Sequence, residues 1–227
     1  MSLHGRWVDE RRNEYYYRLA KKQGYRSRAS YKLLQIDERF NIFKEGDSVA
    51  DLGAFPGGWL QVAREKVGDS GKVVGVDLRR IRPIEGIDTL VGDITEDATM
   101  IELLSLVGKK VDVVLSDMAP NIAGHYSTDH ARSVHLGTYA IDVCDRILRK
   151  NGKLVIKVFM GDMFDMIEKQ LRDRFQSVRV HTPAATRETS SEVYVICKGF
   201  MANKKVKLKV LEPEVEEKMF TVKGNLI

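Results

Sequence analysis

From about residue 48 onward, short runs of β-branched and other apolar residues alternate with segments of helical periodicity. Seven such runs are expected to be strands: Ser48–Leu52, Lys72–Leu78, Thr89–Gly92, Val111–Asp117, Lys153–Phe159, Ser177–His181 and Val193–Lys198. Four helices are expected between them: Trp59–Val67, Glu96–Val107, Asp129–Arg149 and Asp162–Phe175. Strands that are apolar throughout and separated by helices are typical of a parallel sheet covered on both faces. The pattern therefore predicts an α/β fold with a mostly parallel seven-stranded sheet.

The last two predicted strands follow one another without room for a crossover helix. Parallel neighbours need a connection of about a dozen or more residues, usually containing a helix. We therefore expect these two strands to pair antiparallel at one side of the sheet, which then carries one antiparallel edge strand.

The composition divides the chain into three regions. Residues 1–26 are basic and rich in tyrosine, and are expected to form an N-terminal arm. Residues 27–200 are expected to form the globular domain, which opens with a helix over Ser27–Phe40. Residues 201–227 are a charged C-terminal extension, Lys-rich and then Glu-rich, whose structure the sequence does not decide.

A glycine-containing loop follows the first predicted strand and opens a helix. Its residues 51–59 read DLGAFPGGW, with glycines at Gly53, Gly57 and Gly58. Glycines let the backbone approach a ligand closely, and the N-terminus of the helix offers unpaired N–H donors. Pro56 interrupts the spacing that dinucleotide-binding loops use, which argues against a nicotinamide enzyme.

Four carboxylates stand at or near the ends of successive predicted strands: Asp51, Asp77, Asp93 and Asp117. Each by itself could be a helix cap or a turn residue. Ligands of open α/β sheets bind outside the carboxyl ends of the strands, and an acidic residue after the second strand can accept hydrogen bonds from ribose hydroxyls. Four carboxylates in register favour a cationic ligand that contains adenosine. S-adenosylmethionine meets that description, since its sulfonium is positive and it has no phosphate.

Lys157 lies in the middle of an otherwise apolar strand, within VIKVF. Burying an ammonium is unfavourable unless the group is paired. A snorkelling lysine or a structural ion pair would also explain it. Two other charged residues, Lys32 on the first predicted helix and Glu192 at the start of the last strand, are further candidates for the same site.

With these motifs the sequence resembles the FtsJ/RrmJ family of RNA ribose 2'-O-methyltransferases. The resemblance extends from about Arg26 to Phe200 and rests on five segments: SYKL at residues 30–33, DLGAFPGGW at 51–59, SDMAPN at 116–121, VIKVF at 155–159 and SSEVY at 190–194. It implies the Rossmann-like fold of S-adenosylmethionine-dependent methyltransferases. It also aligns a catalytic Lys-Asp-Lys-Glu tetrad with Lys32, Asp117, Lys157 and Glu192. The implied cofactor residues are Gly57, Trp59, Asp77, Asp93 and Asp117, to which the loop adds Gly53; no metal site is implied.

Two roles for Lys157 fit methyl transfer to an alcohol. As a proton acceptor it would need to be partly neutral near pH 7, well below its ordinary pKa of ~10.4. As a fixed cation it would stabilise the charge that develops on the attacking oxygen. Burial and the neighbouring Lys32 favour the neutral form, whereas Asp117 and Glu192 favour the charged one. The sequence leaves both roles open.

The charge distribution indicates where a polyanion would bind. The net charge is +5 overall, but residues 1–44, with 11 basic and 5 acidic residues, carry +6. The tail 201–227 carries +2, so the middle of the chain is slightly acidic. A basic N-terminal side is expected to contact RNA, although a solvated surface helix would have the same composition.

The resemblance implies an RNA substrate. The compact single-domain form is most similar to the family's ribosomal RNA enzymes, which implies a uridine of large-subunit (23S-type) ribosomal RNA, with tRNA as the alternative. A non-catalytic RNA-binding module on the same fold is the alternative of another class. Cys144 and Cys197 lie in apolar runs and are expected to be buried, reduced thiols. Neither a membrane span nor a signal peptide is expected, so we expect a cytoplasmic protein and, by default, a monomer.

Overall fold

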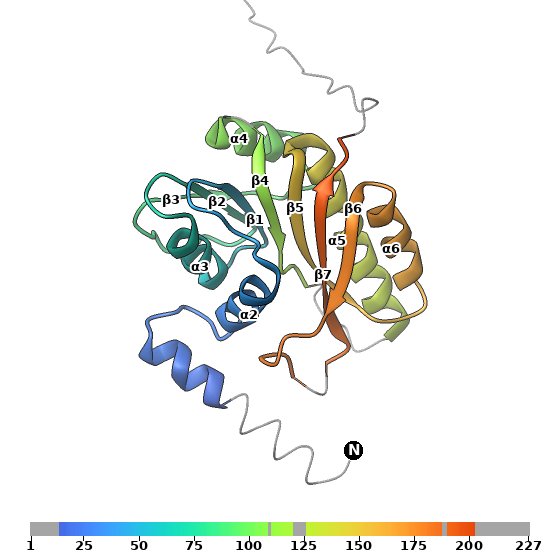
Figure 1. Cartoon of the computed structure of the whole chain (residues 1–227), viewed down its shortest axis with the longest axis horizontal. Coiled ribbons are helices and arrows are strands. Elements are labelled where there is room, and N and C mark those ends of the chain that lie inside the picture. The colour runs from blue at the N-terminus through green and yellow to red at the C-terminus, as the bar shows by residue number, and fades with distance from the viewer. Residues whose placement is uncertain (1–13, 109, 120–125, 188–189, 203–227) are drawn as a thin grey trace, which may run out of the picture.

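The computed structural model describes residues 14–108, 110–119, 126–187 and 190–202, and the side chains of 126–131 lie outside that description. Seven strands form one sheet in the order β3-β2-β1-β4-β5-β7-β6 (Figure 1). The strands are β1 (Ser48–Leu52), β2 (Lys72–Asp77), β3 (Ile87–Val91), β4 (Val111–Ser116), β5 (Leu148–Phe159), β6 (Phe175–His181) and β7 (Glu192–Phe200). The predicted α/β fold is confirmed, with strand bounds that differ from the expected ones by a few residues.

The helices also follow the prediction closely. They are α2 (Ser30–Phe40), α3 (Gly58–Val67), α4 (Asp97–Val107), α5 (Tyr126–Ile147) and α6 (Phe164–Arg172). A further helix, here called the N-terminal helix, covers residues 14–22 of the region predicted as an arm. The C-terminal extension 201–227 lies almost wholly outside the described residues.

The position of the antiparallel strand differs from the prediction. β7 pairs antiparallel with both β5 and β6, so it lies one place inside the edge, and β6 is the edge strand. After the crossover through α6, β6 lies two positions from β5, and β7 occupies the position between them. The expected antiparallel pair at one side of the sheet is confirmed.

The sheet separates two hydrophobic clusters. One lies between the sheet and α4, α5 and α6, and the other lies between the sheet and α2 and α3. Successive residues of a strand face opposite sides, so Val155 of β5 faces α2 and α3 whereas Ile156 faces the other layer. Lys157, two residues after Val155, therefore shares the side of α2 and α3.

The strand order reverses between β1 and β4, which are parallel neighbours. Chains that leave these two strands diverge to opposite sides, and the crevice between them is where open α/β sheets bind ligands. Asp51 near the end of β1 and Asp117 just after β4 therefore lie at this position. Among the described residues, no helix is both long and apolar enough to cross a membrane. Cys144 and Cys197 are buried free thiols, as predicted.

Candidate active site

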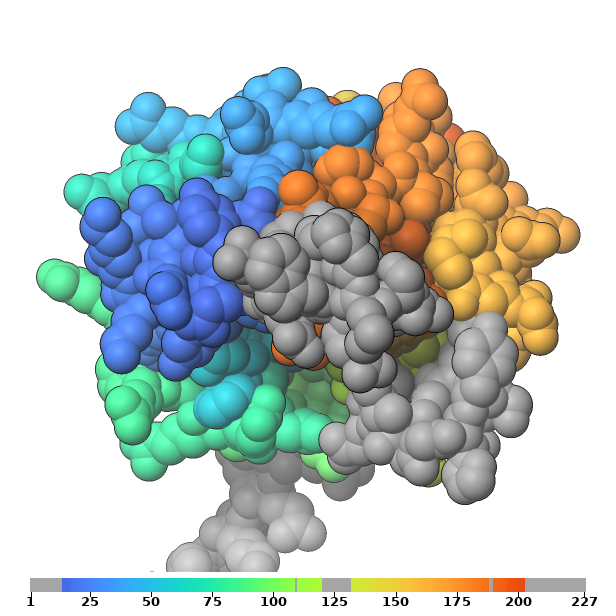
Figure 2. Space-filling view, turned by 90° about the horizontal axis from the view of Figure 1, so that it is seen from below, coloured from blue at the N-terminus to red at the C-terminus, as the bar shows by residue number. Residues whose placement is uncertain are grey.

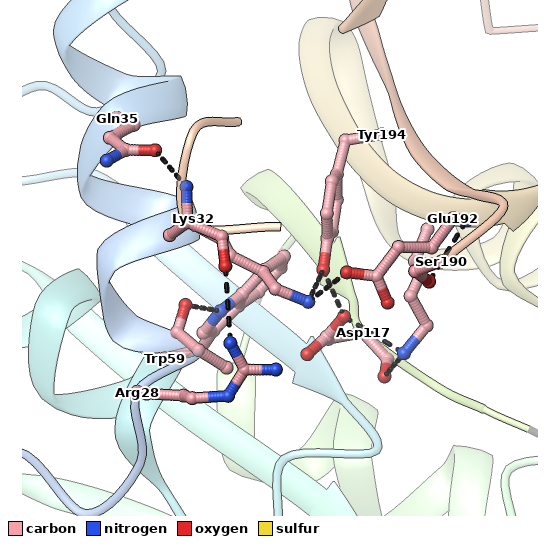
Figure 3. A network of polar contacts seen from close by, with 11 residues as sticks. Arg28, Lys32, Gln35, Trp59, Asp117, Ser190, Glu192 and Tyr194 are labelled. Atoms are coloured by element: carbon pink, nitrogen blue, oxygen red, sulfur yellow. Dashed lines mark hydrogen bonds and ion pairs between the residues drawn. The ribbon is translucent and has the colours of Figure 1, made fainter. Parts of the chain in front are cut away.

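Lys32 and Glu192 form a buried ion pair between α2 and β7. The Lys32 ammonium donates to Oε1 of Glu192, and it lies 3.3 Å from the hydroxyl oxygen of Tyr194 (Figure 3). Both charged side chains are largely shielded from solvent. The pair joins residues 160 positions apart in the sequence, so it ties the first helix of the domain to its last strand.

Lys157 and Asp117 form a second ion pair beside the first. The Lys157 ammonium donates to the main-chain carbonyl of Asp117 at 2.7 Å and lies 3.1 Å from its carboxylate Oδ1. Lys157 is only 9% exposed, so this pairing is what makes its burial in an apolar strand tolerable. The structural ion pair considered from the sequence is thus present, and its partner is a carboxylate at the switch point of the sheet.

Tyr194 connects the two ion pairs. Its hydroxyl donates to Oδ1 of Asp117 at 2.7 Å and lies within reach of the Lys32 ammonium (Figure 3). Tyr194 is also the direct cross-strand neighbour of Lys157. Complete burial, together with the negative charges of Asp117 and Glu192, raises its pKa well above the ordinary value, so the hydroxyl keeps its proton. The four predicted tetrad residues therefore belong to one hydrogen-bonded network.

Lysine side chains hold α2 in place at its C-terminal end. Lys153 of β5 donates to the carbonyls of Asn41 (3.0 Å) and Ile42, and Lys198 of β7 donates to the carbonyl of Phe40. Positive groups at the last carbonyls of a helix satisfy unpaired acceptors and interact favourably with its dipole. Because Lys153 and Lys198 lie on the two strands that carry Lys157 and Glu192, they position Lys32 relative to those residues.

The loop after β1 needs its glycines because neighbouring groups approach it closely. Gly53 has φ +73°, and a Cβ there would lie 2.5 Å from Cγ of Met118. Gly57 has φ +106°, and a Cβ there would lie 2.9 Å from Cδ1 of Ile84. Side chains at these positions would therefore strain the backbone and collide with neighbours. The loop after β1 therefore has the backbone without side chains at Gly53 and Gly57 that the sequence predicted.

Two adjoining cavities meet at this loop. The smaller, about 120 Å³, is lined by Asp51, Trp59 and Asp117 among others. The larger, about 730 Å³, is lined by Asp77 and Asp93 as well as Asp117. Asp117 and Gly53 line both cavities, so the network around Lys157 borders the place where they join.

Backbone amides orient the carboxylates of the larger cavity. Asp77 accepts from the amide of Phe55 through Oδ2 and from that of Arg79 through Oδ1, each at 2.9 Å. Asp93 accepts from the amide of Thr95 at 2.9 Å. A carboxylate oxygen has more than one acceptor site, so each retains capacity to bind a ligand hydroxyl or amine. Both residues lie where the sequence predicted them.

Asp51 departs from the predicted row of four strand-end carboxylates. It lies within β1, is 1% exposed, and neither carboxylate oxygen has a hydrogen-bond partner among the described residues. The reason is the alternation along β1, which directs Asp51 inward on the same side as Val49. Burial raises the pKa of Asp51 well above the ordinary value, and the negative charges of Asp117 and Asp77 raise it further. An unpaired carboxylate lining a cavity is suited to a cationic ligand group.

Residues 25–200 match the family model described as FtsJ-like methyltransferase, which is most of the chain. The chain belongs to the FtsJ-like methyltransferase family. Its relatives include two archaeal proteins named ribosomal RNA large subunit methyltransferase E. The protein from Methanosarcina acetivorans is 53% identical over 191 residues, which cover 84% of this chain and 70% of the relative. The protein from Natronomonas pharaonis is 54% identical over 188 residues, or 83% and 74%.

Solved structures agree with this family assignment. A protein from Plasmodium falciparum, described as a ribosomal RNA methyltransferase, matches with a TM-score of 0.71 and 29% identity over 79% of this chain and 100% of that one. Fibrillarin from Aeropyrum pernix, solved with bound S-adenosyl-L-methionine, matches with a TM-score of 0.54 over 76% of this chain and 75% of that one. At 18% identity, the fibrillarin match supports the fold alone.

For this FtsJ-like methyltransferase, sequence reasoning missed two contributions to the site. Tyr194 lies in the SSEVY segment, where no sequence pattern indicates a role for it, although the alternation of β7 puts it on the same side as Glu192. His135 and Tyr139 of α5 line the larger cavity, and no sequence pattern pointed to them. Trp59 lines the smaller cavity, and its indole also donates to the carbonyl of Ala29 at 2.9 Å and packs on Tyr194. Its side chain therefore supports the start of α2 as well.

Replacing Glu192 with glutamine should destabilise this FtsJ-like methyltransferase by about 3 kcal/mol, because it leaves the buried Lys32 ammonium without a charged partner. Urea unfolding measures the change. The matched control is Glu168→Gln, which removes an ion pair with Arg172 on the surface of α6 and should change stability by less than about 1 kcal/mol. Equal losses in the two variants would contradict the buried-pair interpretation.

Proposed function

We propose that this protein transfers a methyl group from S-adenosylmethionine to the ribose 2'-hydroxyl of a nucleotide in large-subunit ribosomal RNA. The observation that carries the proposal is the paired Lys157 ammonium, held against Asp117 where the two cavities join. This ammonium can contact a ribose hydroxyl that enters from solvent while the methyl donor occupies the cavities.

The residues present fit the methyl donor. Asp51 supplies an uncompensated buried carboxylate for its ammonium, and Gly53 lines both cavities without a side chain. Asp77 would accept from the ribose hydroxyls, and Asp93 from an exocyclic amine. When bound, S-adenosylmethionine supplies an electrophilic methyl group on a positively charged sulfur.

The chain's own residues orient and polarise the attacking hydroxyl. The Lys157 side-chain nitrogen contacts the carbonyl and the carboxylate of Asp117, and a neighbouring negative charge favours the charged form of a lysine. Of the two roles that the sequence left open, we therefore propose the fixed cation, which holds the acceptor oxygen and stabilises the charge developing on it. As the oxygen–methyl bond forms and the sulfur–methyl bond breaks, the hydroxyl proton leaves to solvent water. Tyr194 keeps Asp117 oriented from the other side, and Lys32 with Glu192 keeps Tyr194 in place. Positioning contributes the remainder of the rate increase.

The RNA target is inferred from the relatives. Proteins about half identical over most of this chain are named as large-subunit ribosomal RNA methyltransferases. We propose the same class of substrate here, an activity in the cytoplasm, and a monomer, because one chain supplies every residue of the network described above.

Transfer of tritiated methyl from S-adenosylmethionine to ribosomal RNA tests the proposal, followed by mapping of 2'-O-methyl positions in RNA from cells with and without the gene. We expect label in large-subunit RNA and one ribose methylation that depends on the gene. Label in tRNA alone would replace the proposed substrate. Intact RNA binding without transfer to any RNA would instead favour a non-catalytic binding module.

Lys21 and Lys22 of the N-terminal helix should contribute to RNA affinity through phosphate contacts, because both are exposed on the basic side of the chain. Replacing both with glutamine should flatten the slope of log affinity against log salt by about 1.4, or ~0.7 for each lost contact with single-stranded RNA. Anisotropy titrations over a range of salt concentrations measure the slope. An unchanged slope would show that RNA binds elsewhere.

A further inference from the structure

The N-terminal helix exposes two tyrosines that its packing does not need. Tyr15 is 59% exposed and Tyr17 is 58% exposed. The side of the helix that packs on the domain consists of other residues: Ala20 is buried, and Tyr16 and Leu19 are partly buried against the same cluster. Single exposed apolar side chains are ordinary, but these two large rings lie about 160° apart around the helix and border its exposed arc on both sides.

Basic side chains lie on the exposed arc between the two tyrosines. At 100° per residue, Lys21, Arg18 and Lys22 fall on the arc from Tyr17 to Tyr15, which also holds Glu14, and all of these side chains are exposed. Arg18 pairs with Glu14 one turn away, whereas Lys21 and Lys22 make no ion pair among the described residues. Aromatic rings flanking free positive charge are the combination that binds single-stranded nucleic acid, with bases stacked on the rings and phosphates on the cations.

The helix is fixed to the element that carries Lys32. Gln35 of α2 donates to the hydroxyl of Tyr16 at 2.9 Å, and the hydroxyl of Tyr31 donates to Gln23 at 2.6 Å. The rings of Tyr16 and Tyr31 lie 5.4 Å apart. Tyr31 immediately precedes Lys32, so the exposed tyrosines stand on a surface held rigidly to the candidate site.

The N-terminal helix also lies at the end of the molecule toward which the parallel strands run, which is the end that carries the candidate site (Figure 1). The parallel strands run toward the end of the sheet near which the N-terminal helix is drawn in Figure 1. Figure 2, seen from below, shows this helix in dark blue on that face, next to orange residues of the connection between β6 and β7. The carbonyl of Ala185 in that connection accepts from Arg28, and its amide donates to Gln35 at 3.0 Å. An RNA that reaches Lys157 from this face can also contact the helix.

We propose that Tyr15 and Tyr17 form a stacking site for unpaired bases of the RNA substrate, next to the nucleotide that is methylated. The inference rests on the proposed function for the identity of the ligand as RNA. It adds that the chain distinguishes unpaired from paired RNA outside the catalytic site. Stacking tolerates any base because every base has an aromatic face, so the site favours single-stranded RNA without selecting a sequence.

Fluorescence anisotropy with the full chain tests the proposal, using a short labelled oligouridine and a duplex RNA of matched length, without a methyl donor. Tyr15→Ala and Tyr17→Ala should each weaken oligouridine binding about 10-fold. Tyr15→Phe and Tyr17→Phe keep the ring and should stay within about 2-fold of the unmodified protein. Because rings release no counterions, the salt dependence should keep its slope in all four variants, unlike in the Lys21 and Lys22 variant.

Ile101→Ala is the matched control, since Ile101 is an exposed apolar residue of α4, at the other end of the sheet in Figure 1, and should leave affinity unchanged. Circular dichroism and unfolding midpoints identify any variant that has lost the helix. If Tyr15→Ala is such a variant, the comparison of RNA binding by Tyr17→Phe and Tyr17→Ala decides. Equal binding by the alanine variants, equal losses in the phenylalanine variants, or equal losses on duplex RNA would each overturn the proposal. The binding assay contains no methyl donor and therefore does not depend on methyl transfer. A failure to transfer methyl would count against the proposed function alone, and the binding result would still test the stacking site.

Discussion

Replacing Lys157 with methionine should lower the rate of a single methyl transfer about 10²–10³-fold while leaving the affinity for S-adenosylmethionine within about 2-fold. The reason is that Lys157 contacts Asp117, which lines both cavities, whereas Asp77, Asp93 and Asp51 carry the proposed contacts with the methyl donor. Rapid-quench measurement with tritiated donor and saturating RNA gives the rate, and calorimetry gives the affinity.

Two further measurements separate the roles of Lys157. Lys157→Arg keeps a positive charge that cannot act as a base near neutral pH, so it should retain about 10-fold more activity than Lys157→Met if the fixed cation is the correct role. The methyl-transfer rate of the unmodified protein should then show no increase with pH that follows deprotonation of a lysine. A pH-dependent rise that Lys157→Arg abolishes would establish the proton acceptor instead. Loss of donor binding in Lys157→Met would overturn its assignment to the catalytic step.

Replacing Asp51 with asparagine should weaken S-adenosylmethionine binding about 10–100-fold and at the same time stabilise the unliganded protein. The first effect follows because a charged hydrogen-bond partner contributes about 1.5–3 kcal/mol. The second follows because the carboxylate has no partner among the described residues and lies near two other negative groups. Burial forces this carboxyl group either to stay charged without a partner or to take up a proton, and replacing it relieves a penalty of about 1–3 kcal/mol. Calorimetry and urea unfolding measure the two effects.

The pH dependence of unfolding checks the same residue. The pKa of Asp51 in the folded chain lies well above the ordinary value of ~3.9, so between these two values the folded chain holds a proton that the unfolded chain has released. This group's contribution to stability therefore falls as pH rises through that interval, and Asp51→Asn should reduce the fall.

Asp47→Asn is the matched control for Asp51. Asp47 is also buried with a raised pKa, but it lies just before β1 and accepts from the amide of Lys44 at 2.9 Å, away from both cavities. Its replacement should leave the affinity for the methyl donor unchanged. If both variants weakened donor binding equally, Asp51 would act through the stability of β1 and not through contact.

Most strands could be predicted because each has a complete apolar run bounded by turn residues. β1 runs over Ser48–Leu52 as predicted, and β2 and β4 end within one residue of the predicted ends. β5 begins at Leu148, five residues before its predicted start, because Leu148 pairs with Val111 and the pairing then shifts before Lys153. Such an irregularity depends on the neighbouring strand, which the local pattern does not contain.

The sequence by itself determined the α/β alternation, the glycine loop and the residues of the tetrad, since these depend on local periodicity, short spacings and a family motif. Only the tertiary structure decided that β7 lies between β5 and β6, that Tyr194 joins the two ion pairs, and that Asp51 is buried without a partner. The physical reason is distance along the chain. Lys32 and Glu192 lie far apart in sequence and meet only after the sheet has formed, so their pairing, and with it the position of the Lys157 ammonium, is a property of the folded protein.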